Sequence, residues 1–243
     1  MTEPAAPKAY ETVVAWIEER ILSGTLEVGD SLPAERDLAA QLGVSRSAVR
    51  EAVRTLQAQG VLRSSVGAGG AGGTRVTAMS SGALSRLMRV HVALAHFPLE
   101  DIIEVRVALE RLSVRLAATG ATPEQIEELR RRLADLRAAR TRVEFNDADT
   151  AFHVAIAEAA GNRLAAETTT AIRESVRRPL MERFSAIDED AFDRLSNDLN
   201  DDHEAILEAI ASGDAARGEE IVERHVRTAW VRLLVGDAVT MGA

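Results

Sequence analysis

The sequence predicts a mainly α-helical protein of two domains: an N-terminal helical unit with a small β-hairpin, and a C-terminal all-α antiparallel helical bundle. Apolar residues recur at helical spacing through most of the 243 residues. A glycine-rich run at 67–73 lies between two short segments typical of strands. Beyond residue 98 no alternating strand pattern occurs, and glycine-containing stops separate successive helical segments.

Length and composition limit the possibilities further. A chain of 243 residues with 46% apolar content is long enough to bury two cores. We expect the first domain over 1–79, a connecting helix or linker over 80–97, and the bundle over 98–243. The sequence contains no cysteine, which excludes disulfides and thiolate ligands. Imidazole and carboxylate groups would therefore have to bind any metal ion.

No apolar stretch approaches the length that a membrane span needs, and the N-terminus lacks the pattern of a signal peptide. We therefore expect a cytoplasmic protein that makes no membrane contact. The net charge of -9 argues against a nonspecific polyanion binder. The charge balance between Arg36 and Arg63 is nevertheless locally positive, so a specific anionic partner for this region stays possible.

Three helices are expected before the glycine-rich run. Apolar residues at helical spacing place the first helix over 9–22. A second, short helix has Pro33 in its first turn and ends before Gly43. Ser45 can cap the free amides of a third helix, which ends at Gly60. Two helices joined by a tight glycine-containing turn form a helix-turn-helix.

Segments 61–65 and 74–78 read as short strands around the glycine-rich run, and together they form a hairpin. Such a hairpin extends a helix-turn-helix into a winged helix. A glycine-rich tip can approach a sugar-phosphate backbone closely, although it can equally be a flexible turn that makes no contact. A phosphate-binding loop is disfavoured because no Gly-Lys-Ser/Thr follows the glycines.

Arg46, Ser47 and Arg50 lie in the first turns of the third helix, opposite the apolar Val49 and Val53. A recognition helix presents side chains to the major groove from this position. Arginine can donate two hydrogen bonds to guanine, and serine can bond a base edge or a phosphate. The alternative is an ordinary solvated polar face. The hairpin that follows favours DNA binding.

Two stretches, 29–39 (GDSLPAERDLA) and 42–52 (LGVSRSAVREA), resemble the winged-helix signature of GntR-family transcription regulators. The resemblance implies that Arg36, Arg46 and Arg50 are the principal DNA-contacting arginines. It also implies that Ser45, Ser47 and Gly67 touch the backbone or the groove. The sequence departs from the family at Ala34, where serine is frequent, and in a longer, more glycine-rich wing.

The back of the chain is expected to be helical throughout. Segment 80–97 carries an apolar stripe typical of a connecting helix. The basic run 130–132 lies between inward leucines and is expected to be a solvated helix face. The remaining helices are expected at 98–119, 122–140, 143–160, 162–185, 190–212 and 214–236, with short loops that make neighbours antiparallel.

Four side chains of the bundle suggest a metal site. Asp149 and His153 are four residues apart and share one helix face, while His203 and His225 lie on otherwise apolar stripes. One such histidine alone is usually a satisfied core residue. Burying all four groups unpaired would cost several kcal/mol, whereas one divalent cation satisfies them together. His91 lacks this context, as does His96, and both are expected to be ordinary polar residues.

Asp149-x-x-Phe-His153, the run 202–206 (DHEAI) and His225 resemble the metal-binding pattern of the FadR-like branch of that family, whose C-terminal effector domain is of the FCD type. The resemblance implies a divalent metal ion, zinc first with nickel or manganese as alternatives, and open positions for water or a carboxylate effector. It also makes Arg106, four residues before a glutamate, a candidate for binding an acidic effector, with Arg173 as a second candidate. The alternative for Arg106 is a plain intrahelical ion pair.

We therefore predict a ligand-responsive transcription regulator, a repressor, that binds a palindromic operator in double-stranded DNA as a homodimer and is released by a small organic acid. No catalytic role is predicted. Two alternatives stay open. Three histidines and a carboxylate around a metal also occur in metal-dependent enzymes, although no general base or nucleophile stands at motif spacing here. The metal could also be purely structural.

Overall fold

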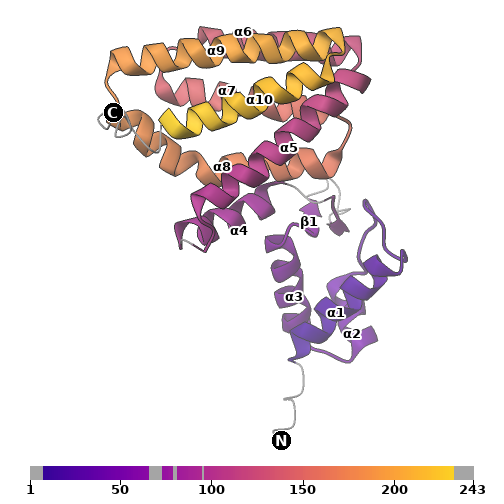
Figure 1. Cartoon of the computed structure of the whole chain (residues 1–243). Helices are drawn as coiled ribbons and strands as arrows, with labels where there is room; N and C mark the ends of the chain where they lie inside the picture. Colours follow the sequence, from indigo (N-terminus) through magenta and orange to yellow (C-terminus); the bar gives the residue numbers. More distant parts are fainter. Residues whose placement is uncertain (1–7, 66–72, 79–80, 95, 233–243) are drawn as a thin grey trace, which may run out of the picture. The chain divides into compact units, whose positions relative to one another are not determined.

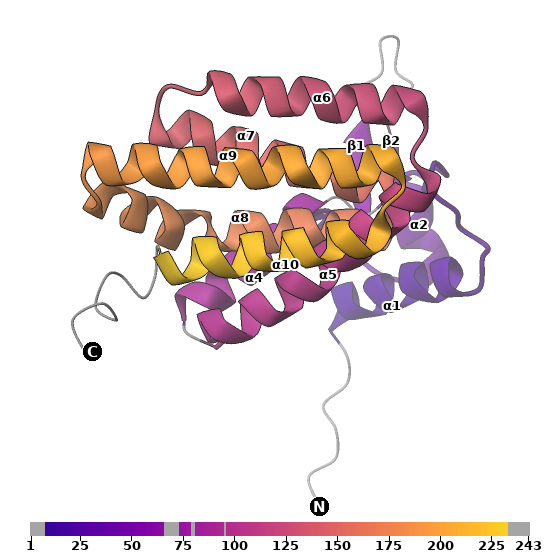
Figure 2. The same ribbon diagram turned by 45° about the horizontal axis from the view of Figure 1, so that its top comes forward.

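The computed structural model describes residues 8–65, 73–78, 81–94 and 96–232 (Figures 1 and 2). The chain divides into two compact units, Met1–Ala83 and Leu84–Ala243. The prediction of a mainly α-helical protein with one small hairpin is confirmed. Among the described helices, none is long and apolar enough to cross a membrane.

The described residues of the first unit form three helices followed by a two-stranded antiparallel sheet. Leu62 of the first strand pairs with Val76 of the second, so the strands meet at the base of the hairpin. Its core is formed by Val13, Ile17, Leu38, Val49, Val53, Leu56, Leu62 and Val76. The elements are α1 (Ala9–Leu22), α2 (Glu35–Leu42), α3 (Arg46–Ala58), β1 (Leu62–Ser65) and β2 (Gly73–Val76).

The turn between α2 and α3 follows from two residues. Gly43 adopts a left-handed conformation with φ of 65°, which ends α2 and would strain most other residues. Ser45 then caps α3, where its side chain accepts a hydrogen bond of 3.2 Å from the backbone of Ala48. The expected first-turn place of Pro33 is wrong. The amide of Leu38 bonds the carbonyl of Ala34, so Pro33 lies just before the helix.

The second unit is an all-α bundle. Its helices are α4 (Ser81–Ala93), α5 (Leu99–Gly120), α6 (Pro123–Ala138), α7 (Arg142–Ala159), α8 (Arg163–Ala186), α9 (Glu189–Ser212) and α10 (Ala215–Trp230). Figure 2 shows α6 and α9 side by side on one side of the bundle. Helix α5 packs against α7, α8, α9 and α10 and is the central helix. The last residues of the expected helix 214–236 lie outside the described part of the chain.

Local signals position the helices that carry the site. Thr141 caps α7 in a reciprocal capping box, and Asp188 caps α9. On α10, Gly218 is required for close packing, because a Cβ there would lie 2.6 Å from the side chain of Val114 on α5. The positions of the helix ends, together with the close approach of α10 to α5, determine which side chains of α7, α9 and α10 lie in the core.

Candidate functional site

The four predicted metal ligands meet in the middle of the bundle. Asp149 and His153 come from α7, His203 from α9 and His225 from α10, and one donor atom of each lies within 4.8 Å of all the others. His153 Nε2 lies 3.2 Å from His203 Nε2 and 3.3 Å from His225 Nε2. Asp149 Oδ1 is 3.1 Å from His203 Nε2. The four side chains therefore form a group that could hold a metal ion.

The geometry and burial of these groups fit a divalent cation. The three imidazoles are almost fully buried, and all present Nε2 to the same point. Two nitrogens bound at ~2.0–2.1 Å to one tetrahedral ion would lie about 3.3 Å apart, which matches the observed separations. A cation at the centre satisfies all of the Nε2 atoms.

The histidines are held in the form that a metal requires. Burial lowers the pKa of His153 to about 3, with the nearby Arg173 guanidinium acting in the same direction. Burial also lowers the pKa of His203 to about 4, with a further contribution from His225. Both rings are therefore neutral at pH 7. A neutral ring offers a lone pair to a metal ion, whereas an imidazolium offers none.

These lowered pKa values predict that chelated protein loses stability in mild acid. Because the pKa of both rings is about 6.5 in the unfolded chain, that chain binds more protons than the folded one between pH 6.5 and the folded values of about 3 and about 4. The free energy of unfolding should then fall by up to ~1.4 kcal/mol per pH unit for each ring. Denaturant unfolding at pH 7 and pH 5 in chelator measures this.

Two histidine variants distinguish the contribution of these rings to the pH dependence from that of other titrating groups. His203→Asn should lose about half of the pH dependence, because one of the two shifted groups is gone. His96→Asn, at an exposed position, should keep all of it. Identical free energies of unfolding at the two pH values for the unsubstituted protein would contradict the buried, neutral state of the histidines.

Glu110 on α5 belongs to the same site, which sequence reasoning missed. Its Oε2 lies 2.6 Å from His153 Nδ1. Its Oε1 accepts hydrogen bonds from Arg106 Nε at 2.7 Å and from Arg173 Nη2 at 2.8 Å. Burial opposes the negative charge of Glu110, but Arg173, His153 and Arg106 together hold the pKa of its carboxyl well below the ordinary value.

Glu110 has a specific consequence for the metal ligands. A carboxylate beside Nδ1 keeps the imidazole proton of His153 on that nitrogen. The lone pair of His153 is then on Nε2, which faces the other ligands. A sequence signal for this role existed, since Glu110 interrupts the apolar stripe formed on α5 by Val107, Val114 and Ala117. In the sequence it was noted only as the partner of Arg106.

The two predicted effector arginines differ in what they bind. Arg173 uses both terminal nitrogens, one toward Asp149 Oδ2 at 2.7 Å and one toward Glu110, so it acts as their counter-ion. Arg106 makes the intrahelical pair with Glu110 through Nε alone. Its terminal nitrogens hydrogen-bond to no other described residue. Of the two, Arg106 is the one whose terminal nitrogens bond no other described residue and could bind a carboxylate.

A small cavity lies beside the four ligands. Its polar lining consists of Arg106, Asn146, Asp149 and His225, and its apolar lining includes Phe145, Leu180 and Phe184. Its volume is about 30 Å³. This is room for one or two water molecules and not for an organic acid. The site as it stands is therefore too small for an organic acid.

Five of the six predicted DNA-contacting residues lie in the described part of the first unit. Arg46, Ser47 and Arg50 are exposed on α3, and Ser45 is occupied as the helix cap. Arg50 Nε donates to Glu35 on α2 at 2.7 Å, which orients the guanidinium. Arg36 is exposed and pairs with Asp37 at 3.1 Å. The sixth predicted residue, the wing glycine at position 67, lies outside the described residues.

Substituting either recognition-helix arginine should weaken specific DNA binding. We expect Arg46→Ala and Arg50→Ala each to cost ~1–3 kcal/mol of operator affinity, because each guanidinium can bond one guanine edge or phosphate. Fluorescence anisotropy at fixed salt measures the change. Arg194→Ala, at an exposed position on α9 of the other unit, is the charge-matched control and should bind as the unsubstituted protein does. Equal affinities for all four proteins would refute this assignment.

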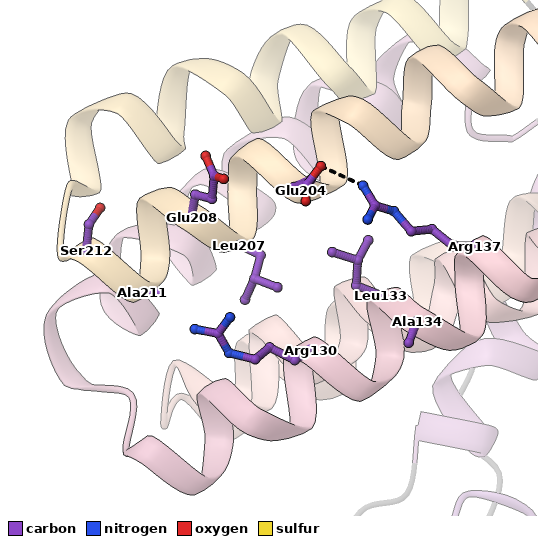
Figure 3. Close-up of a pocket in the computed structure, with 9 residues that line it drawn as sticks. All are labelled: Arg130, Leu133, Ala134, Arg137, Glu204, Leu207, Glu208, Ala211 and Ser212. Atoms are coloured by element: carbon purple, nitrogen blue, oxygen red, sulfur yellow. Dashed lines mark hydrogen bonds and ion pairs between the residues drawn. The ribbon is translucent and has the colours of Figure 1, made fainter.

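Other polar groups of the bundle lie apart from the ligand cluster. In the run 130–132, Arg131 and Arg132 pair with Glu128 on the same helix, as expected of a solvated face. Figure 3 shows an open groove between α6 and α9, where Arg137 reaches Glu204 at 2.6 Å. The nitrogens Nδ1 of His91 and His96 lie 2.9 Å apart near the end of α4. No third potential ligand among the described residues joins this pair.

Comparison with known proteins matches both units. Residues 9–71 match the family model for bacterial regulatory proteins of the gntR family, and residues 101–228 match the FCD domain. The chain is 32% identical over 224 residues to an L-lactate dehydrogenase operon regulatory protein of Escherichia coli (strain K12), covering 89% of this chain and 81% of that protein.

A second relative from the same organism is the Glc operon transcriptional activator, 33% identical over 168 residues, or 63% of this chain and 61% of that protein. The solved structure of a Streptococcus agalactiae GntR protein superimposes with a TM-score of 0.57 at 24% identity, covering 90% of this chain and 98% of that one. This structural similarity concerns the fold.

Proposed function

The chain belongs to the gntR family of bacterial regulatory proteins and carries an FCD domain, and from that premise we propose that it is a metal-dependent, acid-responsive repressor. The family members it resembles are transcription regulators and not enzymes. The four potential metal ligands lie in one unit and the helix-turn-helix in the other, so sensing and DNA binding would occur in separate units.

The DNA partner is a palindromic operator bound by a homodimer in the cytoplasm. A two-fold protein matches a two-fold operator, with one recognition helix in each half-site. Arg46 and Arg50 of α3 are proposed to read or clamp the major groove. Ser47 and the wing glycine would contact the backbone. Because arginines neutralise phosphates, operator affinity should fall steeply with salt.

The metal is held by Asp149, His153, His203 and His225, with zinc the first candidate and nickel or manganese as alternatives. A bound divalent cation supplies positive charge and open positions for oxygen ligands. Glu110 holds His153 in place, and Arg173 holds Asp149. The observation that carries the proposal is the convergence of these four side chains beside the free end of Arg106.

The effector is a small carboxylate whose oxygens face the cation while Arg106 donates to its carboxyl group. By its name, one relative regulates an L-lactate dehydrogenase operon. A 2-hydroxy acid carries adjacent hydroxyl and carboxyl oxygens that can approach one ion together. L-Lactate is therefore the first effector to test. Acid binding alters the bundle, and linkage then lowers operator affinity by a factor of about 5–150.

Operator titration tests this proposal. DNA selected from a random pool by the full-length protein would be titrated by anisotropy, with zinc-loaded and chelated protein, with and without L-lactate. We expect L-lactate to weaken binding only for the zinc-loaded protein. His203→Asn should abolish the response and His96→Asn should keep it. If chelation changes the melting temperature while no small acid changes DNA affinity, the metal is structural and the proposal is wrong.

A further inference from the structure

The cavity beside the metal ligands is too small for the effector, so part of its wall has to move. Its volume of about 30 Å³ is far below what even a two-carbon acid occupies. Two residues of the polar wall are held by buried ion pairs, Asp149 by Arg173 and Arg106 by Glu110. The apolar wall includes Leu180 and Phe184 from the C-terminal part of α8.

Helix α8 contains the element that allows this movement. Pro179 stands inside the helix, one residue before Leu180 and five before Phe184. Proline has no amide proton, so the carbonyl of Ser175 loses its usual helical hydrogen bond. Ser175 is itself buried. The part of α8 after Pro179 is therefore joined to the first part by a weakened backbone ladder.

There is space on the outer side of this same segment. A groove of about 860 Å³ runs between α8 and α4, lined on one side by Ser175, Pro179 and Glu182 and on the other by residues that include Val90. Figures 1 and 2 both place α4 beside α8. Within segment 180–186, Leu180 and Phe184 thus line the small inner cavity, while Glu182 lines the outer groove.

We propose that Phe184 sets the upper size limit of the effector, and that the α8 segment after Pro179 moves outward, toward α4, when the acid enters. The inference rests on the proposed function and adds the residue that determines specificity. Phe184 is 4% exposed and packs edge-on against Phe145 and Phe192. A ring held on two sides yields by a limited amount, which restricts the effector to acids with a short apolar tail.

The test compares 2-hydroxy acids of increasing chain length: glycolate, lactate, 2-hydroxybutyrate and 2-hydroxyhexanoate. Calorimetric titration into zinc-loaded, full-length protein gives an affinity for each. We expect the unsubstituted protein to bind the short acids and to lose about tenfold or more beyond its limit. Phe184→Leu should shift that limit to a longer acid. Phe192→Leu, in the same aromatic cluster but outside the cavity lining, should leave it unchanged.

A kinetic variant tests the movement separately. Pro179→Ala restores the missing amide, which can donate a hydrogen bond to the carbonyl of Ser175. An added barrier of about one backbone hydrogen bond should lower the association rate constant of the acid about fivefold. An unchanged association rate would overturn the outward movement. Identical chain-length limits in the unsubstituted and Phe184→Leu proteins would overturn the role of Phe184 while leaving the proposed function intact. Absence of binding of every acid to every protein would overturn the proposed function and this inference with it.

Discussion

Replacement of Glu110 by alanine should lower the free energy of unfolding by ~3–5 kcal/mol, although the residue binds neither DNA nor the metal directly. Its carboxylate accepts hydrogen bonds from Arg106 Nε and Arg173 Nη2. The Glu110 side chain is only 3% exposed. Without it, two buried guanidinium groups keep only Asp149 as a nearby counter-ion. Denaturant unfolding of the metal-loaded protein at pH 7 measures the loss.

A matched glutamate provides the control. Glu182 pairs with Arg178 on α8 at 2.9 Å, again four residues apart, but both side chains are largely exposed. Glu182→Ala should therefore cost no more than ~0.5 kcal/mol. The contrast between the two substitutions isolates the effect of burial. Similar losses for both variants would show that Glu110 does not anchor the site.

Removing the metal should have an effect of comparable size. An ion that binds the folded chain alone stabilises it by about 4 kcal/mol when its free concentration is a thousand times its dissociation constant. Chelation should therefore lower the midpoint of denaturation of the bundle markedly. The free energies of unfolding of zinc-loaded and chelated protein, measured at equal ionic strength, give the difference.

His203→Asn tests whether that difference arises at the proposed ligands. This substitution removes a ligand on α9, so added zinc should no longer stabilise the protein. His91→Asn alters a histidine outside the cluster and should leave the stabilisation intact. Zinc stabilisation that survives in His203→Asn would place the ion elsewhere.

The helices could be predicted closely because their ends are set by local chemistry. Segment 190–212 was expected from periodicity and the following glycine, and α9 spans Glu189–Ser212. Asp188 caps its start, and Gly213 ends it with φ of 76°. Both signals act within a few residues of the helix ends, so they can be recognised in the sequence without knowledge of the packing.

The group that could hold a metal ion was predictable for a related reason. His153, His203 and His225 each interrupt an apolar stripe, and a side chain on such a stripe must enter the core. Which buried groups then meet depends on how the helices pack. Glu110 gave the same signal on α5, but only the packing of α5 against α7 and α8 brings it to His153 and Arg173.

Features that arise purely from tertiary contacts had no local signal. The pairing of Arg50 with Glu35 requires α2 and α3 to meet at one angle. The volume of the cavity beside the potential metal ligands depends on side chains from five different helices. Periodicity indicates which face of a helix is buried, but it does not give the distance between two buried faces.

The most direct test of the account measures the affinity for L-lactate of the zinc-loaded protein, free and saturated with operator DNA. Linkage requires that if the acid weakens operator binding by some factor, the operator weakens acid binding by the same factor. We predict a factor between about 5 and 150, equal in both directions. An acid affinity that is the same with and without operator would contradict communication between the metal cluster and the recognition helix.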